Sequence, residues 1–297
     1  MIGLTRVYQF LTQTRWTLGF IDFDADRILD PAARLDVRWL RNNPLHGWFA
    51  DPFILSADDK KIIVLVEEFV YGRRGRISKV VIDRSTMRYE RIVPLISIPT
   101  HLSFPAWFVN NGKIYIYPES SQSGKLSLYE YSPSSERAEY VMDISTLPLV
   151  DAAIFEIDGK KYMSATLPPE DNGRKLELRP FVNGRCDDRD EVVVRMVFDD
   201  YVGRNAGQAF CVGNRTFRPA QQCRKTYGEG VVLQEFIVEN GQLGVQEIRR
   251  LYSDNRKYKL GLHTFNVFDG RLVVVDARGY RFPVLAKVLK SLVRITK

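Results

Sequence analysis

Residues 51–69 read DPFILSADDKKIIVLVEEF, and their plan returns four more times along the chain. An apolar run is followed by a polar turn at Asp58-Asp59 and by a second run rich in β-branched residues, which is the pattern of a β-hairpin. The stretch is therefore one unit of a repeat.

The four further copies keep the same order of parts. In the second copy the run FPAWFV is followed by the turn Asn111-Gly112 and the run KIYIYPE, and in the third copy DAAIFE is followed by Asp158-Gly159 and KKYMSAT. In the fourth copy QAFCV is followed by Gly213-Asn214 and RTFRPAQ, and in the fifth TFNVF is followed by Asp269-Gly270 and RLVVVD. The copies start at residues 51, 104, 151, 207 and 263, so consecutive starts are 53, 47, 56 and 56 residues apart. Asn-Gly and Asp-Gly favour hairpin turns because these turns need positive φ. A period of about 50 residues built from short strands predicts an all-β fold, a five-bladed β-propeller.

Further strand-like runs behind the hairpins complete four blades, near residues 48–100, 101–146, 147–203 and 204–256. The fifth copy has no strand after Asp276, whereas two strand-like runs, residues 16–22 and 35–40, precede the first copy without a hairpin of their own. An open sheet edge invites association, so we expect residues 15–40 to pair with residues 257–278 and close the ring. The prediction is one domain of residues 1–297 with a short basic C-terminal helix.

The charge of the chain is unevenly spread. The formal net charge is +7, and six Lys or Arg residues but no acid follow Asp276. This excess favours anionic partners such as phosphate or lipid headgroups, and no nucleic-acid-binding motif accompanies it. In residues 282–297 the apolar positions Leu285, Val288, Leu289 and Leu292 share one helical face, and Lys287, Lys290, Arg294 and Lys297 line the other. Such a helix either lies on an anionic membrane or packs its apolar face on the propeller.

The sequence also bears on the compartment. Its first residues hold only a short, interrupted apolar run, Val7–Leu11, and no window has the 18 or more apolar residues of a transmembrane helix. The three cysteines, Cys186, Cys211 and Cys223, are an odd number without CxxC spacing, which indicates neither a disulfide framework nor a zinc site. We expect a cytoplasmic protein, peripheral on the inner membrane face if the tail binds lipid, with no metal or cofactor.

The ends of the hairpin strands carry candidate functional residues. The first residue of one hairpin strand lies beside the last residue of the other, so five radial hairpins place these residues on one rim around a central funnel. They are Asp51, His101, Ser103, Asp151 and His263 at strand starts, and Glu67 or Glu68, Glu119, Arg218, Gln221 and Asp276 at strand ends. Each alone has a structural explanation, since Asp caps turns or holds backbone amides and His can be buried in a core. Recurrence in several blades favours a functional rim.

Several of these residues lie in segments that resemble a known family. The segments are Trp48–Phe53, Glu67–Phe69 with Gly75–Ile77, His101–Pro105, Tyr117–Ser120, Pro148–Ile154, Arg218–Gln221 with Tyr227-Gly228, and Gly261–Asn266. With the blade plan they resemble the five-bladed propellers of glycoside hydrolase families 43, 62, 32 and 68. They resemble more closely the propeller domain of plant glucosamine inositolphosphorylceramide transferases and its bacterial relatives. The resemblance spans residues 48–278.

The resemblance to family 43 implies three carboxylates: an Asp general base in the first blade, an orienting Asp in the third, and a Glu general acid in a later blade. Asp51 and Asp151 match the first two. The fourth blade begins Arg204-Asn-Ala-Gly-Gln-Ala-Phe and offers no acid, so hydrolysis requires Glu119 or Glu68 to act instead. A phosphate leaving group needs less protonation, and Arg204 and Arg218 are placed to stabilise it. Trp48 and the remaining rim residues are expected to bind substrate.

Three functions follow as hypotheses. The first is a glycosyltransferase of bacterial surface-polysaccharide or glycolipid synthesis. Its donor would be a sugar, furanosyl among the candidates, that is linked to a nucleotide or to polyprenyl phosphate. The second is a family 43-like glycoside hydrolase that acts on furanosides. The third is a non-catalytic carbohydrate-binding propeller that serves a partner enzyme.

Overall fold

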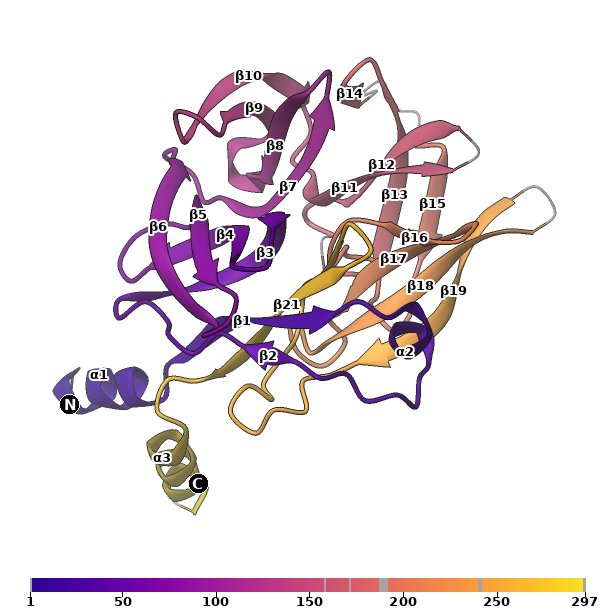
Figure 1. Cartoon of the computed structure of the whole chain (residues 1–297). Helices are drawn as coiled ribbons and strands as arrows, with labels where there is room; N and C mark the ends of the chain where they lie inside the picture. Colours follow the sequence, from indigo (N-terminus) through magenta and orange to yellow (C-terminus); the bar gives the residue numbers. More distant parts are fainter. Residues whose placement is uncertain (1, 158, 171, 187–191, 240–241, 296–297) are drawn as a thin grey trace.

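The five-bladed β-propeller is confirmed by the computed structural model, which describes residues 2–157, 159–170, 172–186, 192–239 and 242–295 (Figure 1). Side chains are described between residues 7 and 290 of these ranges. Five antiparallel sheets follow one another around the ring in chain order. The expected Asp158-Gly159 turn falls partly outside the described residues, because Asp158 is not among them.

Four sheets are each formed by consecutive strands. The first contains β3 (Gly47–Ala57), β4 (Lys61–Val70), β5 (Arg76–Asp83) and β6 (Arg88–Ile96). The second contains β7 (Ser103–Asn110), β8 (Lys113–Glu119), β9 (Leu126–Ser132) and β10 (Arg137–Ser145), with a 3-10 turn, η1 (Ser121–Ser123), between β8 and β9. The third contains β11 (Val150–Ile157), β12 (Lys160–Thr166), β13 (Lys175–Val182), β14 (Arg185–Cys186) and β15 (Val194–Val197). The fourth contains β16 (Phe210–Val212), β17 (Arg215–Gln222), β18 (Gly230–Glu239) and β19 (Gln242–Leu251).

The fifth sheet joins the two ends of the chain, as the sequence predicts. Its order is β2 (Arg38–Trp39), β1 (Thr14–Asp22), β21 (Leu272–Tyr280) and β20 (Phe265–Phe268). β1 pairs with β21 without interruption, from Thr14 opposite Tyr280 to Asp22 opposite Leu272. This antiparallel ladder satisfies the edge that β21 would otherwise expose.

Apolar faces of neighbouring blades pack together and hold the ring. Leu18 and Phe20 of β1 pack with Val64 and Val66 of β4, so the closing blade shares a core with the first blade. Phe155 of β11 stacks on Phe236 of β18 with ring centroids 4.6 Å apart, which joins the third blade to the fourth. Each seam therefore buries side chains that are distant in the sequence.

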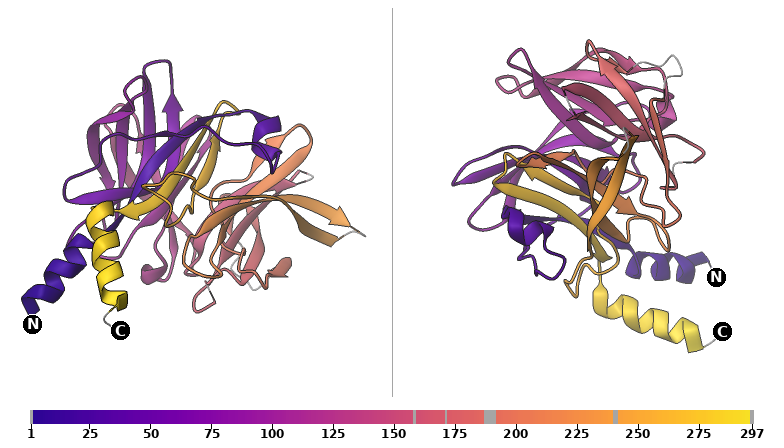
Figure 2. Two further views of the ribbon diagram at one scale, coloured as in Figure 1. Left: turned by 90° about the horizontal axis from the view of Figure 1, so that it is seen from below. Right: turned by 90° about the vertical axis from the view of Figure 1, so that its right-hand side faces the viewer.

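The described residues form three α-helices outside the blades: α1 (Ile2–Leu11), α2 (Ala25–Leu29) and α3 (Pro283–Ile295). The predicted C-terminal helix is thus confirmed as α3, although residues 296 and 297 of the predicted tail lie outside the described part. Among the described helices, none has the length and apolarity that crossing a bilayer requires. α1 and α3 extend from the propeller next to each other (Figure 2).

Candidate functional site

The inner strands of the blades, β3, β7, β11, β16 and β20, begin on one face of the ring, which we call the site face. The opposite face, which carries hairpin turns such as Asn111-Gly112 and Asp269-Gly270, is called the turn face. The second strand of each blade runs antiparallel to the inner strand and returns to the site face. The structure therefore brings strand starts and strand ends together on the site face, as the hairpin pattern requires.

Three inner strands carry the same irregularity at the site face. The pairing register shifts between Ala50 and Phe53, between Ser103 and Pro105, and between Val150 and Ala153. The bulged residues Asp51, Phe104 and Asp151 have φ values of 47°, 44° and 48°. Positive φ is unfavourable for residues other than glycine and concentrates where the surroundings fix the backbone. The bulge is a shared feature of three blades.

Each bulge turns a backbone N–H toward a carboxylate of the preceding blade. Asp51 N donates to Asp276 Oδ2 at 3.0 Å, Phe104 N donates to Asp51 Oδ2 at 3.1 Å, and Asp151 N donates to Glu119 Oε2 at 3.2 Å. An unpaired buried N–H is costly, so these acids are needed to stabilise the ring. Asp51, Glu119 and Asp276 therefore have a structural task, whatever their part in chemistry.

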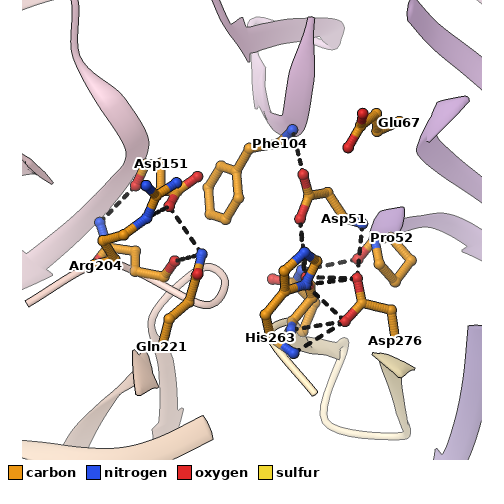
Figure 3. Close-up of polar contacts among 12 residues, drawn as sticks. Asp51, Pro52, Glu67, Phe104, Asp151, Arg204, Gln221, His263 and Asp276 are labelled. Atoms are coloured by element: carbon orange, nitrogen blue, oxygen red, sulfur yellow. Dashed lines mark hydrogen bonds and ion pairs between the residues drawn. The ribbon is translucent and has the colours of Figure 1, made fainter. Parts of the chain in front are cut away.

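Asp51, His263 and Asp276 form a buried cluster between the first and last blades (Figure 3). His263 Nδ1 lies 2.8 Å from Asp276 Oδ2 and 3.8 Å from Asp51 Oδ1, and the Trp16 ring stacks on the imidazole at 3.8 Å. Burial opposes the charge on His263, but Asp276 and Asp51 raise its pKa to about 9. Burial raises the pKa of Asp51 to about 7, although His263 acts in the opposite direction. The cluster therefore binds protons more tightly than its isolated side chains would.

A metal ion would fit this cluster poorly. Ligand atoms of Asp51, His263 and Asp276 do lie within 4.8 Å of one another. However, Asp276 already accepts hydrogen bonds from the backbone N–H groups of Asp51, His263 and Thr264, and the Thr264 hydroxyl lies 3.1 Å from both carboxylates. A cation would have to displace these donors, whose positions are fixed by the strands. The backbone N–H groups and the Thr264 hydroxyl already stabilise the negative charge of these carboxylates.

A second cluster surrounds Asp151 on the other side of the Phe104 ring (Figure 3). Asp151 Oδ2 accepts hydrogen bonds from Arg204 Nε at 2.8 Å and from Gln221 Nε2 at 2.9 Å. The Arg204 guanidinium lies 5.2 Å from the centre of the Tyr227 ring, and 12% of its side chain is exposed. Burial opposes the charge, yet Asp151 raises the pKa of Arg204 well above its usual value. The pair is a fixed, charge-assisted contact at the edge of the funnel.

Glu119 is the more accessible carboxyl group next to this pair. It is partly buried, and its Oε1 accepts a hydrogen bond from the Ser121 hydroxyl at 3.2 Å. Burial and the neighbouring negative charge of Asp151 raise the pKa of Glu119 well above its usual value. A carboxyl group with a raised pKa is suited to exchange a proton with a bound sugar.

His101 and Glu67 form a third contact at the site face. His101 Nε2 lies 3.1 Å from Glu67 Oε1, while Gly75 N donates to His101 Nδ1 at 3.1 Å. Glu67 raises the pKa of His101, but the Gly75 N–H opposes a proton on Nδ1 and favours the neutral ring with its hydrogen on Nε2. Gly75 is required here, because a Cβ would stand 2.6 Å from His101 Cε1.

The structure leaves some of the expected residues outside these clusters. Glu68 faces away from Glu67 along β4 and binds Arg76 and Ser78 of its own sheet, so Glu67 is the acid that joins the rim. Arg218 is 1% exposed and donates to Asn205, Gln234 and the carbonyl groups of residues 202 and 203. Burial lowers its pKa to about 9. Arg218 therefore supports the loop that carries Arg204 and does not reach a leaving group directly.

Two other expected residues stay near the rim without joining a cluster. Trp48 stacks on Phe69 with ring centroids 4.7 Å apart, and Ser103 lies opposite Glu119 in the ladder of β7 and β8. Trp16, Tyr227 and Thr264 complete the two main clusters, although none of them is among the rim residues that the hairpin pattern selects. Thr264 does follow His263 directly, and Tyr227 lies in a segment of the family pattern, whereas Trp16 has no local signal because it belongs to the closing strand β1.

The fold and the rim define a five-bladed propeller whose site face carries carboxylates in contact with two histidines and an arginine. The chain belongs to the family described as glucosamine inositolphosphorylceramide transferase 1, N-terminal, whose model matches residues 41–253. It is 24% identical over 255 residues to glucosamine inositolphosphorylceramide transferase 1 of Arabidopsis thaliana, which covers 73% of this chain and 31% of that protein. The protein of the same name from Oryza sativa subsp. indica is 24% identical over 218 residues, with 69% of this chain and 29% of that protein covered.

The chain thus spans less than a third of the length of these curated relatives. Similar solved structures include an exo-β-1,3-galactanase from Phanerochaete chrysosporium, with a TM-score of 0.49 and 13% identity over 67% of this chain and 50% of that chain. A GH43_1 enzyme from Xanthomonas citri has a TM-score of 0.49 and 11% identity over 79% of this chain and 88% of that chain.

Proposed function

We propose that this protein is a glycosyltransferase of glycolipid or surface-polysaccharide synthesis that transfers a sugar, furanosyl among the candidates, from a phosphate-activated donor. Its family and its curated relatives, which are named as transferases, support this class of reaction. The observation that carries the proposal is the group formed by Glu119, Asp151 and Arg204, because it combines a proton-exchanging carboxyl group with a fixed cation at one edge of the funnel.

The proposed roles follow from these contacts. Asp151, held by Arg204 and Gln221, fixes the position of the arginine. The arginine, together with Arg224 and Lys225 of the exposed loop before Tyr227, stabilises the departing phosphate. Glu119 takes the proton of the acceptor hydroxyl, since a raised pKa makes its carboxylate a stronger base. Asp51, which is only 4% exposed, orients the site through Phe104 and Thr264.

We place the reaction on the cytoplasmic side of a membrane. The odd number of cysteines and their spacing support a reducing compartment. The donor would be a nucleotide-linked or polyprenyl-phosphate-linked sugar, whose negative charge matches the basic loops of the site face.

Glycoside hydrolysis is the second candidate, and Glu119 is the observation that favours it. A hydrolase needs a protonated carboxyl group beside the leaving oxygen, and burial next to Asp151 raises the pKa of Glu119 in the required direction. With Asp51 as the general base and Glu119 as the general acid, the rim would then supply both carboxyl groups that a glycoside hydrolase needs. A non-catalytic sugar-binding role remains the third possibility, because the chain covers only a part of its relatives.

The test is a transfer assay with the full chain. Purified protein is incubated with nucleotide-linked and polyprenyl-phosphate-linked sugars and a short-chain lipid acceptor, and products are identified by mass spectrometry. Glu119→Gln should reduce transfer about 10²- to 10⁴-fold in a variant that circular dichroism shows to be folded at the assay temperature. Glu139→Gln, an exposed change in the same blade, is the matched control and should keep full transfer. Release of free sugar from furanosides without transfer would select the hydrolase, and sugar binding without turnover would select the binding module.

A further inference from the structure

The two terminal helices form one structural unit. β1 begins at Thr14, three residues after α1 ends, and is paired there with Tyr280, three residues before α3 starts. The Phe10 and Phe282 rings lie 5.5 Å apart, and the Arg281 guanidinium lies 5.2 Å from the first ring and 5.4 Å from the second. The ends of the chain are therefore packed together beside the closing blade.

This unit stands on the site face. β20 runs from the rim toward the turn at Asp269-Gly270, and β21 runs back past Asp276 to Tyr280, so the strand that leads into α3 ends on the side of the rim. The connection between β1 and β2, which contains α2, starts at the opposite end of β1, where Phe23 N donates to Arg271 O beside the turn at Asp269-Gly270. The left view of Figure 2 shows α2 at one end of the molecule and the two terminal helices at the other.

The helices expose apolar side chains instead of packing them on the propeller. Val284 is 75% exposed, Leu285 49% and Val288 52%, and on the neighbouring helix Val7 is 55% and Phe10 50% exposed. Only Ala286 of the described α3 side chains is buried. Of the two alternatives for the tail, packing on the blades and binding a membrane, these exposures favour the second, because they leave apolar side chains of both helices open to a partner.

The two ends of the chain, which contain these helices, are rich in cations. Residues 1–21 and 277–297 together contain eight Lys or Arg residues and no Asp or Glu. The remaining residues hold 35 cations against 36 acids, so the two ends account for the whole positive net charge. On the site face, the β4–β5 loop, residues 71–75, adds Arg73 and Arg74 without an acid. At the opposite end of β1, the connection of residues 23–37 carries four acids and two arginines.

We propose that α1 and α3 together are a peripheral membrane anchor that docks the site face onto an anionic phospholipid bilayer. Exposed apolar side chains enter the interface while surrounding cations bind lipid headgroups, the combination that holds amphipathic helices at membranes. The acidic connection of residues 23–37 is repelled, which sets the orientation. If the proposed transfer is correct, the funnel opens toward the bilayer and its acceptor is a lipid whose headgroup enters from that side.

Vesicle sedimentation of the full chain tests the anchor. Binding to vesicles of phosphatidylcholine with phosphatidylglycerol should exceed binding to phosphatidylcholine alone and should weaken as salt rises. A cation near an anionic surface strengthens binding about fivefold, so Lys287→Gln with Lys290→Gln should weaken it about 25-fold. Changing Val284, Leu285 and Val288 to Ser should weaken it further. The control changes Val109, Val182 and Val238 to Ser, which are 57%, 59% and 57% exposed elsewhere, and should bind as the unaltered protein does.

Hydrogen exchange of the vesicle-bound protein tests the orientation. Residues 71–75 and 223–229 of the site face should gain protection, while the turns at Asn111-Gly112 and Asp269-Gly270 should not. Equal binding to neutral and anionic vesicles, loss of binding in the control, or protection of the turn face would overturn the proposal. Transfer to a soluble short-chain acceptor should be unchanged in the helix variants. If the unaltered protein binds vesicles but transfers no sugar to any acceptor, the proposed function is refuted and the membrane anchor is not.

Discussion

Replacing Asp276 by Asn should destabilise the propeller in a manner that depends on pH. The carboxylate is fully buried and receives three backbone N–H groups as well as the ring of His263. Asn keeps the shape but removes the negative charge and turns an NH₂ group toward these donors. Removing one partner of a buried ion pair costs about 3–5 kcal/mol, which is the loss expected near pH 6.

The pH dependence follows from the raised pKa of His263. A histidine whose folded pKa lies above its unfolded value stabilises the fold fully below about pH 6.5, and the contribution disappears as the pH rises through about 9. Above that pH the ring is neutral in the unaltered protein too, so Asp276→Asn then removes only a hydrogen-bond acceptor, at about 1–3 kcal/mol. The loss should therefore shrink by about 2 kcal/mol between pH 6 and pH 10.

Urea denaturation at both pH values measures this difference. Asp269→Asn is the matched control, because Asp269 pairs with Arg271 on the exposed turn face, where such pairs contribute about 0–1 kcal/mol. The unaltered protein should itself lose stability from about pH 4 to pH 9, since the raised pKa of Asp51 acts with the same sign as that of His263. An equal loss for Asp276→Asn at pH 6 and pH 10 would refute the charged pair.

Three further changes test how the rim and the ring are held. Gly75→Ala should cost about 1–3 kcal/mol in urea denaturation and displace His101, because its Cβ has no room; an unchanged unfolding midpoint would contradict this. Arg218→Met should cost about 3 kcal/mol or more, since it leaves several buried acceptors unpaired, and a loss below about 1 kcal/mol would show that water replaces the side chain. Phe155→Ala should cost about 3–5 kcal/mol by opening a cavity against Phe236, and a smaller loss would mean that the seam between these blades collapses.

The sequence by itself determined the repeat, and through it the fold. Alternating apolar runs and Asn-Gly or Asp-Gly turns act over a few residues, so their effect can be seen without knowing the rest of the chain. The orphan strands at the start and the missing pair at the end likewise predicted the closing blade, because the last hairpin needs strands beside it to complete its sheet. The same hairpin geometry was enough to place the rim residues on one face.

The tertiary structure decided which rim residues meet and what each one does. Adjacent acids such as Glu67 and Glu68 look alike in sequence, yet the alternation of β4 sends one to His101 and the other to Arg76. The bulges at Asp51, Phe104 and Asp151 depend on carboxylates of neighbouring blades, contacts that join residues 32 to 225 positions apart. Which carboxyl group retains a proton depends on burial and on nearby charges, and both arise only when the blades close around the axis. The same closure brings the two ends of the chain together on the face where the site opens.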